Sequence, residues 1–167
     1  VREVALDEIS ALRRARLHLR VADALLAQPG SDDDQAEIVA EHLWAAVPVG
    51  VGGRAAAALE RAAEVAVRRS AFGAAEDLLE RAVQLRRAAG ADPADTEAEL
   101  VDCTRLLSIQ RSVHGYSSVG GSPHLARAKH IARGRDNVDA LVRLLWTEWA
   151  AFDASCDLDR ADQVARE

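Results

Sequence analysis

Apolar residues recur at every third or fourth position through most of the chain, which is the period of an amphipathic α-helix. In the first such segment, residues 7–27, Leu17, Val21, Ala24 and Leu25 fall on one stripe. Segments that alternate β-branched and polar residues, as half-buried strands do, are absent from the sequence. Proline, glycine and polar capping residues delimit seven further helical segments: 35–47, 54–69, 73–89, 94–112, 123–133, 137–152 and one that starts at 158. The pattern therefore predicts an all-α protein of about eight helices.

Two of the connections are rich in glycine. Residues 50–53, Gly-Val-Gly-Gly, lead straight into a helical segment and, extended to Ala55, loosely match a dinucleotide-binding fingerprint. Such a motif requires a buried strand before its glycines, whereas here a helical segment that Pro48 ends comes before them. We therefore expect a connector between helix pairs and not a phosphate-binding loop. The second connection, residues 113–124, is the least helical stretch, and we expect it to be mobile.

The composition agrees with an all-α fold and argues against several classes of function. Apolar residues make up 49 % of the chain but aromatic residues only 4 %, and much of the apolar share is alanine, the best helix former. A net charge of −6 argues against direct contact with nucleic acid, which requires concentrated positive charge. The chain has neither a signal peptide nor an 18-residue apolar run, so neither secretion nor a membrane span is expected.

Two further compositional features bear on context. Cys103 and Cys156 lie far apart and belong to no Cys-x-x-Cys pair, which favours a reduced, cytoplasmic protein with buried thiols. The sequence contains no methionine. It is therefore expected to be a piece of a longer polypeptide, and its function that of a part.

A repeat frame distinguishes between a helical bundle and a stack of helix pairs. A tetratricopeptide repeat pairs two helices over about 34 residues and places small and large apolar residues at fixed positions. All five of these positions are filled as the repeat requires in one frame, by Leu59, Ala63, Ala75, Leu79 and Ala82.

A second, weaker frame places Leu145, Ala161 and Ala165 correctly but has Trp149 where a small residue is usual. We therefore predict a right-handed α-solenoid of antiparallel helix pairs with degenerate tetratricopeptide-like repeats. The predicted divisions of the single domain 1–167 are an N-terminal pair, the clearest repeat, a degenerate repeat that includes the 113–124 connector, and a C-terminal repeat: 1–48, 54–90, 94–133 and 137–167.

The sequence offers no catalytic constellation or metal motif. The histidines form no pair at metal-ligand spacing and are expected at helix contacts or on the surface: His18, His42, His114, His124 and His130. Acidic pairs fall at predicted caps and turns, and no apolar pocket that would raise the pKa of a general acid is evident. We therefore expect no enzyme activity and no cofactor.

The tryptophans Trp146 and Trp149 carry the main functional hypothesis. Both are core residues in one interpretation. In the other, Trp149 packs inside the second repeat, while Trp146 faces the concave groove of the array, with Arg143 one turn earlier. Glu64 and Arg68, from the first repeat frame, complete the candidate groove, which would bind a peptide or another ligand.

Several segments resemble one known family. "ALRRARLHLRVADALLAQPG" and "AEIVAEHLWAA" look like the region that follows the ATPase and winged-helix modules of large bacterial STAND-type regulators. "RRSAFGAAEDLLERAVQL" is similar to that family's first clear tetratricopeptide repeat, "HGYSSV" with "HLARAKHIA" to its Gly-Tyr connector and Ala-rich helix, and "LLWTEWAAFDASCDLDRADQVARE" to its next repeat. The matching positions in the second and last of these segments are Glu37, Ala40, His42, Trp44, Ala45 and Ala46, and Asp157, Asp159, Arg160 and Ala161.

The resemblance implies a sensor and scaffold array. Family members are mostly LuxR-type or antibiotic-regulator-type transcription factors, and others carry cyclase or kinase output domains. Such an array would bind an inducer or a protein partner and control the neighbouring ATPase module. Two alternatives stay open: a regulatory arm of a signalling adenylate or guanylate cyclase or kinase, and a pure assembly scaffold with possible self-association.

Overall fold

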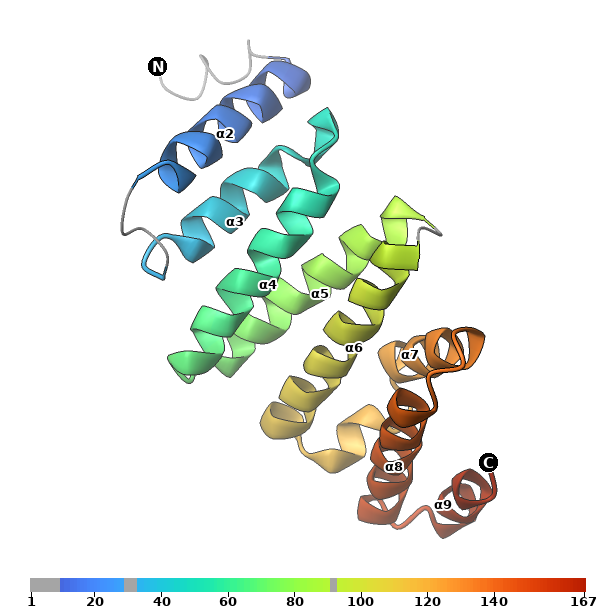
Figure 1. The fold of residues 1–167 in the computed structure, drawn as a ribbon. Coiled ribbons are helices and arrows are strands. Elements are labelled where there is room, and N and C mark those ends of the chain that lie inside the picture. The colour runs from blue at the N-terminus through green and yellow to red at the C-terminus, as the bar shows by residue number, and fades with distance from the viewer. Residues whose placement is uncertain (1–9, 29–32, 91–92) are drawn as a thin grey trace.

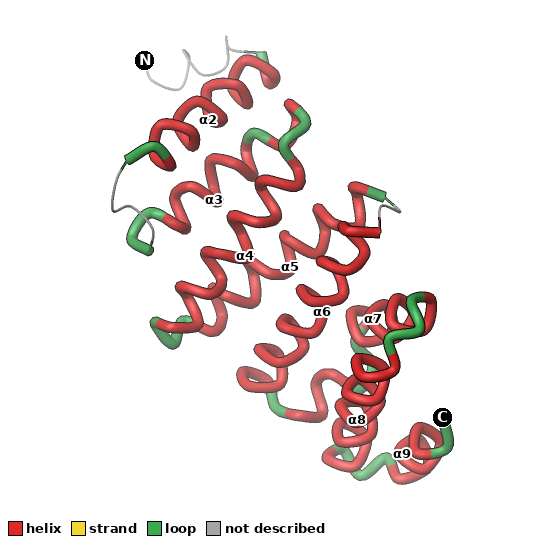
Figure 2. The backbone as a smooth tube through the Cα atoms, viewed as in Figure 1, coloured by secondary structure: helices red, strands yellow, loops and turns green. Residues whose placement is uncertain are grey.

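In a computed structural model of the chain, residues 10–28, 33–90 and 93–167 are described. This part of the chain is all-helical and contains no strand, and short loops join its helices (Figure 2). The α-helices are α2 (Ala11–Leu26), α3 (Ala36–Ala45), α4 (Gly52–Arg68), α5 (Phe72–Ala89), α6 (Pro93–His114), α7 (Pro123–Gly134), α8 (Val138–Ala154) and α9 (Leu158–Ala165). Two single-turn 3-10 helices, η1 (Val47–Val49) and η2 (Tyr116–Val119), lie between them.

Polar side chains cap several of these helices. The side chains of Ser10, Ser122, Asn137 and Asp157 accept hydrogen bonds from backbone N–H groups in the first turns of α2, α7, α8 and α9. Such caps satisfy N–H groups that have no partner within the helix. These capping hydrogen bonds explain why polar residues before a helical segment predicted where the helices start.

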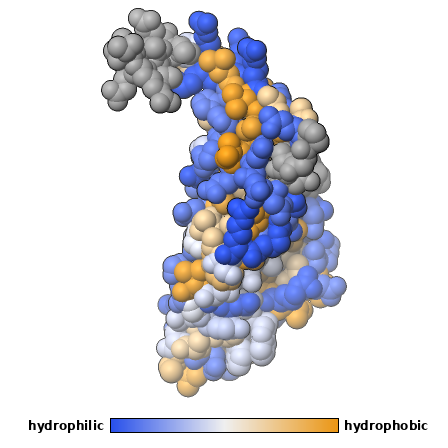
Figure 3. Space-filling view, turned by 90° about the vertical axis from the view of Figure 1, so that its left-hand side faces the viewer, coloured by the Kyte–Doolittle hydropathy of each residue, from blue (hydrophilic) through white to orange (hydrophobic). Residues whose placement is uncertain are grey.

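The described part of the molecule is elongated, and α2 and α9 lie at its opposite ends (Figure 1). Each α-helix packs mainly against the helices before and after it in the chain. Seen from the side, the surface is largely hydrophilic with hydrophobic patches between (Figure 3). No described helix is both long and apolar enough to cross a membrane.

Alanine dominates the interior. One core cluster extends from α3 to α8, and a smaller one, formed by Ala22, Val39, Leu43 and Ala55, lies under α2. The five residues of the first repeat frame are all buried, at 2 % exposure or less. In the second frame Ala161 is buried, whereas Ala165 is exposed.

Three of the tight turns have the same geometry. Ser70, Asp136 and Cys156, each two residues beyond a helix end, have φ values of 60°, 52° and 60°. In each turn the next N–H donates to a carbonyl five residues back, as from Ala71 to Ala66. This is the Schellman arrangement that ends many helices. The same turn therefore recurs at α4–α5, α7–α8 and α8–α9.

The glycine-rich connector at 50–53 is confirmed as a helix-to-helix junction. The 3-10 turn η1 precedes it, Gly50 has a φ of 88° that favours glycine, and α4 begins at Gly52. Residues 33–49, which the structure describes without a gap, contain no strand before the glycines, so the geometry of a dinucleotide-binding loop is missing there.

The connector at 113–124, which the sequence predicted as the least helical stretch, is partly helical, and its η2 turn packs against α8 while most of its residues are exposed. It contains the end of α6 and the turn η2, and Val119 is fully buried. A Cβ atom at Gly120 would lie 3.2 Å from both the Ala151 Cβ and the Phe152 Cε1 atoms of α8. The glycine therefore permits η2 to pack closely on α8, a contact between distant segments that local composition does not reveal.

Two other expectations concern the N-terminus and the cysteines. Residues 7–9 of the predicted first helix lie outside the described residues, and that helix is seen from Ala11. Cys103 is buried as expected, but Cys156 is exposed, so the expectation of two buried thiols is wrong. The reason is positional, because Cys156 occupies the positive-φ site of the α8–α9 turn.

Candidate functional site

The four candidate groove residues fall into two adjoining grooves, with α6 between them. Glu64 and Arg68 line a groove of about 390 Å³ between α4 and α6, here called the α4/α6 groove. Its remaining lining is Glu60, Ala63, Val67, Leu79, Arg105, Ser108 and Ile109. Arg143 and Trp146 line a second groove, of about 510 Å³, the α6/α8 groove. Its other residues are Thr104, Leu107, Ser108, Arg111, Val142, Leu144 and Thr147.

Ser108 belongs to both grooves, so they meet on one side of α6. A further groove, of about 320 Å³, lies between α2 and α4 above α3. Arg61 lines this groove, and its Nη1 atom lies 3.7 Å from Oε2 of Glu64, which lines the α4/α6 groove. These three grooves therefore lie in series between alternate helices, and the α4/α6 and α6/α8 grooves meet at Ser108.

Charges in the α4/α6 groove are largely compensated. Arg105 Nη1 lies 3.2 Å from Glu64 Oε1, across from α6 to α4. Arg68 donates to Asp33 at 2.6 Å. The apolar part of this groove includes Val67, which is 39 % exposed.

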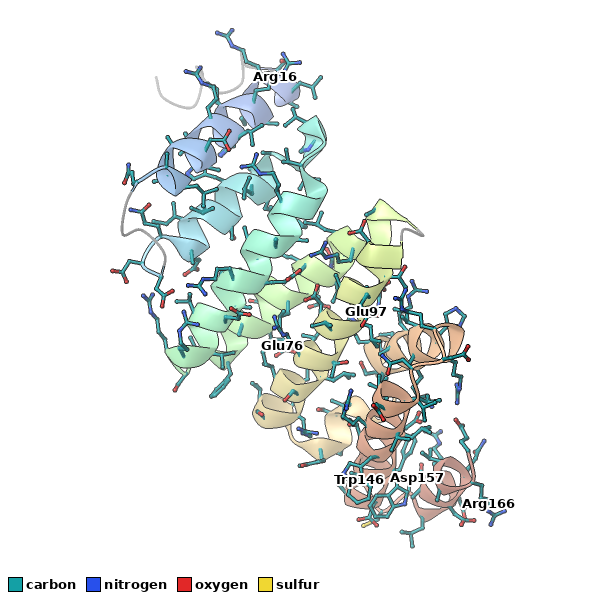
Figure 4. The ribbon with its side chains drawn as sticks, in the orientation of Figure 1. Arg16, Glu76, Glu97, Trp146, Asp157 and Arg166 are labelled. Carbon is teal, nitrogen blue, oxygen red and sulfur yellow. The ribbon has the colours of Figure 1, made fainter. Side chains whose placement is uncertain are left out.

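The α6/α8 groove has a different character. Trp146 is 64 % exposed and stacks on the half-buried Trp149, with ring centroids 5.0 Å apart and planes inclined by 26°. Arg111 lies 4.9 Å from the ring centroid of Tyr116 in a cation–π contact. Trp146 lies toward the end of the molecule that α8 and α9 form (Figure 4). It is thus a surface residue, and the interpretation that both tryptophans are core residues is wrong.

A buried charge cluster lies beside the α4/α6 groove. Arg86 of α5 donates to Glu60 of α4 at 2.6 Å and to Asp95 of α6 at 3.0 Å. Its Nε atom lies 3.8 Å from Asp102 Oδ2, which is too long for a hydrogen bond. Asp102 is 1 % exposed, and neither of its carboxylate oxygens has a donor partner among the described residues. Three carboxyl groups therefore surround one guanidinium.

The surroundings of Asp102 favour its protonated form. Burial, followed by the charge and the hydrogen bond of Glu60, raises the pKa of Asp102 from 3.8 to about 7. A hydrogen bond between two carboxyl groups requires a proton on one of them. Sequence reasoning missed this residue and found no environment that would raise the pKa of an acid. The signal was present, since Asp95 and Asp102 share one helical face with the buried Cys103 and Leu106.

A second buried carboxylate, Glu99, is fully compensated. It accepts hydrogen bonds from Arg127 at 2.9 and 2.7 Å and from Arg87 at 2.9 Å, and it joins α5, α6 and α7. Burial would raise the pKa of Glu99, but hydrogen bonds and charge from Arg127 and Arg87 lower it overall. Nearby, burial raises the pKa of the Cys103 thiol to about 11, so the thiolate is disfavoured.

The histidines are packing and surface residues, as expected. His18 of α2 and His42 of α3 approach to 2.7 Å between their Nδ1 atoms, while His114 bonds Glu76 at 3.0 Å. His124 is buried and His130 is exposed. Within the described part of the chain, no three His, Cys, Asp or Glu side chains are gathered closely enough to hold a metal ion.

This arrangement is suited to recognition. It offers a series of open grooves with arginines, hydroxyls and one exposed indole, which can bind a polar and apolar chain segment. A comparison with models of known protein families finds no match, and no curated protein matches the sequence significantly.

Proposed function

We propose that the chain is a non-catalytic binding module, a right-handed α-solenoid of tetratricopeptide-like helix pairs. In this proposal the helices pair as α2–α3, α4–α5, α6–α7 and α8–α9, and the first helix of each pair lines the binding face. The module serves as the sensor and scaffold array of a multidomain STAND-type transcriptional regulator. Its partner is a protein segment, and occupation of the face controls the neighbouring ATPase module.

One observation carries the proposal: beside a groove of about 500 Å³ between α3, α4 and α5, three others lie in series between alternate helices. These three occupy α2/α4, α4/α6 and α6/α8; the last two meet at Ser108, and the Arg61–Glu64 ion pair joins a lining residue of the first to one of the second. A stack in which each pair contacts only its neighbours generates such a continuous face. Packing of each helix mainly on its chain neighbours, and the repeated turn geometry, support the same assignment.

Control of the neighbouring module follows from the stacking. Because contacts are mostly between successive helices, small rotations at each junction add up along the array. A segment that spans α4, α6 and α8 binds best to one curvature and shifts the population toward it. The resemblance in "RRSAFGAAEDLLERAVQL" and "LLWTEWAAFDASCDLDRADQVARE" connects this behaviour to the STAND regulators.

A display selection tests the proposal. Random 12-residue peptides are selected on the purified chain and then tested against two variants. Ser108→Tyr places a ring where two grooves meet, and Gln84→Tyr places the same ring on an exposed position of α5. Enriched peptides should bind wild type and Gln84→Tyr with equal affinity, and they should no longer bind Ser108→Tyr. The proposal fails when no peptide is enriched, or when Ser108→Tyr retains the binding.

A further inference from the structure

Positive charge is uncompensated in the α6/α8 groove. Arg111 and Arg143 line it, and no acidic side chain of the described residues does. Arg143 is exposed and forms no ion pair within the described part of the chain, whereas Arg105 and Arg68 in the adjoining groove pair with Glu64 and Asp33. The whole chain carries a net charge of −6. A groove with only arginines on such a chain is complementary to an anionic partner.

Apolar surface borders this positive charge. Trp146 is 64 % exposed and Val142 59 % exposed, and both lie on α8 beside Arg143. Stacking on Trp149 holds the Trp146 ring in place, so the ring loses little side-chain freedom when it is covered. Exposed tryptophan and arginine in one groove are the residue types that dominate binding energy at interfaces.

The extent of the surface favours an extended chain over a compact ligand. The α6/α8 groove, of about 510 Å³, continues at Ser108 into the α4/α6 groove of about 390 Å³. A small anion would fill one groove and leave the other open. A peptide in an extended conformation rises more than 3 Å per residue and can cross α6 to occupy both.

We infer that the α6/α8 groove binds an extended acidic segment of a partner protein, an inference that rests on the proposed function. A carboxylate of the segment pairs with Arg143 and Arg111. An aromatic or aliphatic side chain next to it covers Trp146 and Val142. The segment then continues over Ser108, where its flanking apolar residue meets Val67 and Ile109 of the α4/α6 groove.

The test reads the charge of the selected peptides and the effect of reversing one arginine. Peptides enriched on wild type are sequenced, and the best binder is synthesised in three forms: as selected, with Asp and Glu changed to Asn and Gln, and with them changed to Lys. Their affinities are measured by fluorescence anisotropy on wild type, Arg143→Glu and Arg16→Glu. The control makes the same charge change on an exposed residue of α2, at the opposite end of the molecule (Figure 4).

We expect acidic peptides with an aromatic or aliphatic residue to be enriched. A charge-assisted hydrogen bond is lost in Arg143→Glu and replaced by repulsion, so affinity should fall at least about 10-fold. Affinity for Arg16→Glu should stay within about 2-fold of wild type, since exposed charges separated by more than a Debye length are screened. The Asn/Gln form should bind weakly and the Lys form weaker still, and higher salt should reduce the affinity of the acidic form.

Other results would overturn the inference. Neutral or basic peptides that lose binding to Ser108→Tyr would leave the proposed function standing and remove the acidic partner. Equal losses of peptide affinity in Arg143→Glu and Arg16→Glu would show that binding responds only to the net charge of the chain. Sedimentation equilibrium gives the remaining outcome: self-association of wild type that Arg143→Glu abolishes would identify a second copy as the occupant.

Discussion

The buried carboxyl group of Asp102 makes the stability of this protein depend on pH in an uncommon direction. Its pKa is raised by burial and by the neighbouring Glu60 from 3.8 to about 7. Between these values the folded chain holds a proton that the unfolded chain releases. The free energy of unfolding therefore falls as pH rises. The contribution is complete below pH 3.8 and is lost as pH rises through about 7.

The magnitude follows from that interval. Each pH unit between the folded and unfolded pKa values is worth about 1.4 kcal/mol. The interval of about three units therefore gives at most ~4 kcal/mol in total. Between pH 5 and pH 8 the expected loss is about 3 kcal/mol. Because Asp102 is 1 % exposed, solvent screening reduces this value little.

The variant Asp102→Asn isolates the effect. Its amide is neutral at every pH and keeps the shape of the side chain. Burial lowers the pKa values of His18 and His124 from 6.5, so these side chains contribute a slope of opposite sign. They are present in both proteins, so the difference between wild type and variant removes their contribution. Relative to wild type, Asp102→Asn should gain about 3 kcal/mol in unfolding free energy between pH 5 and pH 8.

Urea unfolding followed by tryptophan fluorescence at pH 5, 6, 7 and 8 gives the required free energies. Asp77→Asn, an exposed change on α5, is the matched control and should run parallel to wild type. The comparison uses the change in unfolding free energy with pH. It does not use the constant difference between wild type and variant, because the new amide also alters hydrogen bonding at Glu60. Parallel curves for wild type and Asp102→Asn would refute the argument that Asp102 holds a proton at neutral pH.

Three further substitutions test individual contacts by urea unfolding. Trp146→Ala should cost about 1 kcal/mol, chiefly the ring stacking, and the half-buried Trp149→Ala about 2–3 kcal/mol, so equal costs would contradict a surface role for Trp146. Gly120→Ala should destabilise by about 1–2 kcal/mol because its methyl group meets α8, while Gly121→Ala, with open space around it, should not. Ser70→Gly should stabilise by about 0.5–1 kcal/mol by relieving a φ of 60°, and a loss of stability would show that the turn is not strained.

The sequence predicted the helices well because their ends carry local signals. The segment 73–89 is α5 (Phe72–Ala89), and 123–133 is α7 (Pro123–Gly134). Proline at a first turn, polar caps and glycine after a helix act within a few residues, so single-sequence patterns contain them. The helical periodicity of apolar residues along α4 and α5 is also a local signal, and the five residues of the first repeat frame, which it identified, are buried.

The candidate site was harder to predict from the sequence because it depends on packing between helices. Glu64 with Arg68 and Arg143 with Trp146 were predicted as one groove, but the structure separates them by α6. The residue that joins the two grooves, Ser108, had no signal of its own in the sequence. Only the positions of three helices relative to one another make an ordinary serine the junction of two grooves.

The same reason explains why the buried charges of α6 were missed. Carboxylates at helical spacing are usually solvated, and the arginines that bury Glu99 come from α5 and α7, 12 and 28 residues away. The contact between α5, α6 and α7 is filled largely by aliphatic side chains such as Leu79, Leu106 and Leu125. Buried charge adds a second constraint, because displacement of Glu99 from Arg87 and Arg127 would leave a charge unpaired. The register between these helices therefore depends on the shape of the apolar side chains and on these ion pairs together.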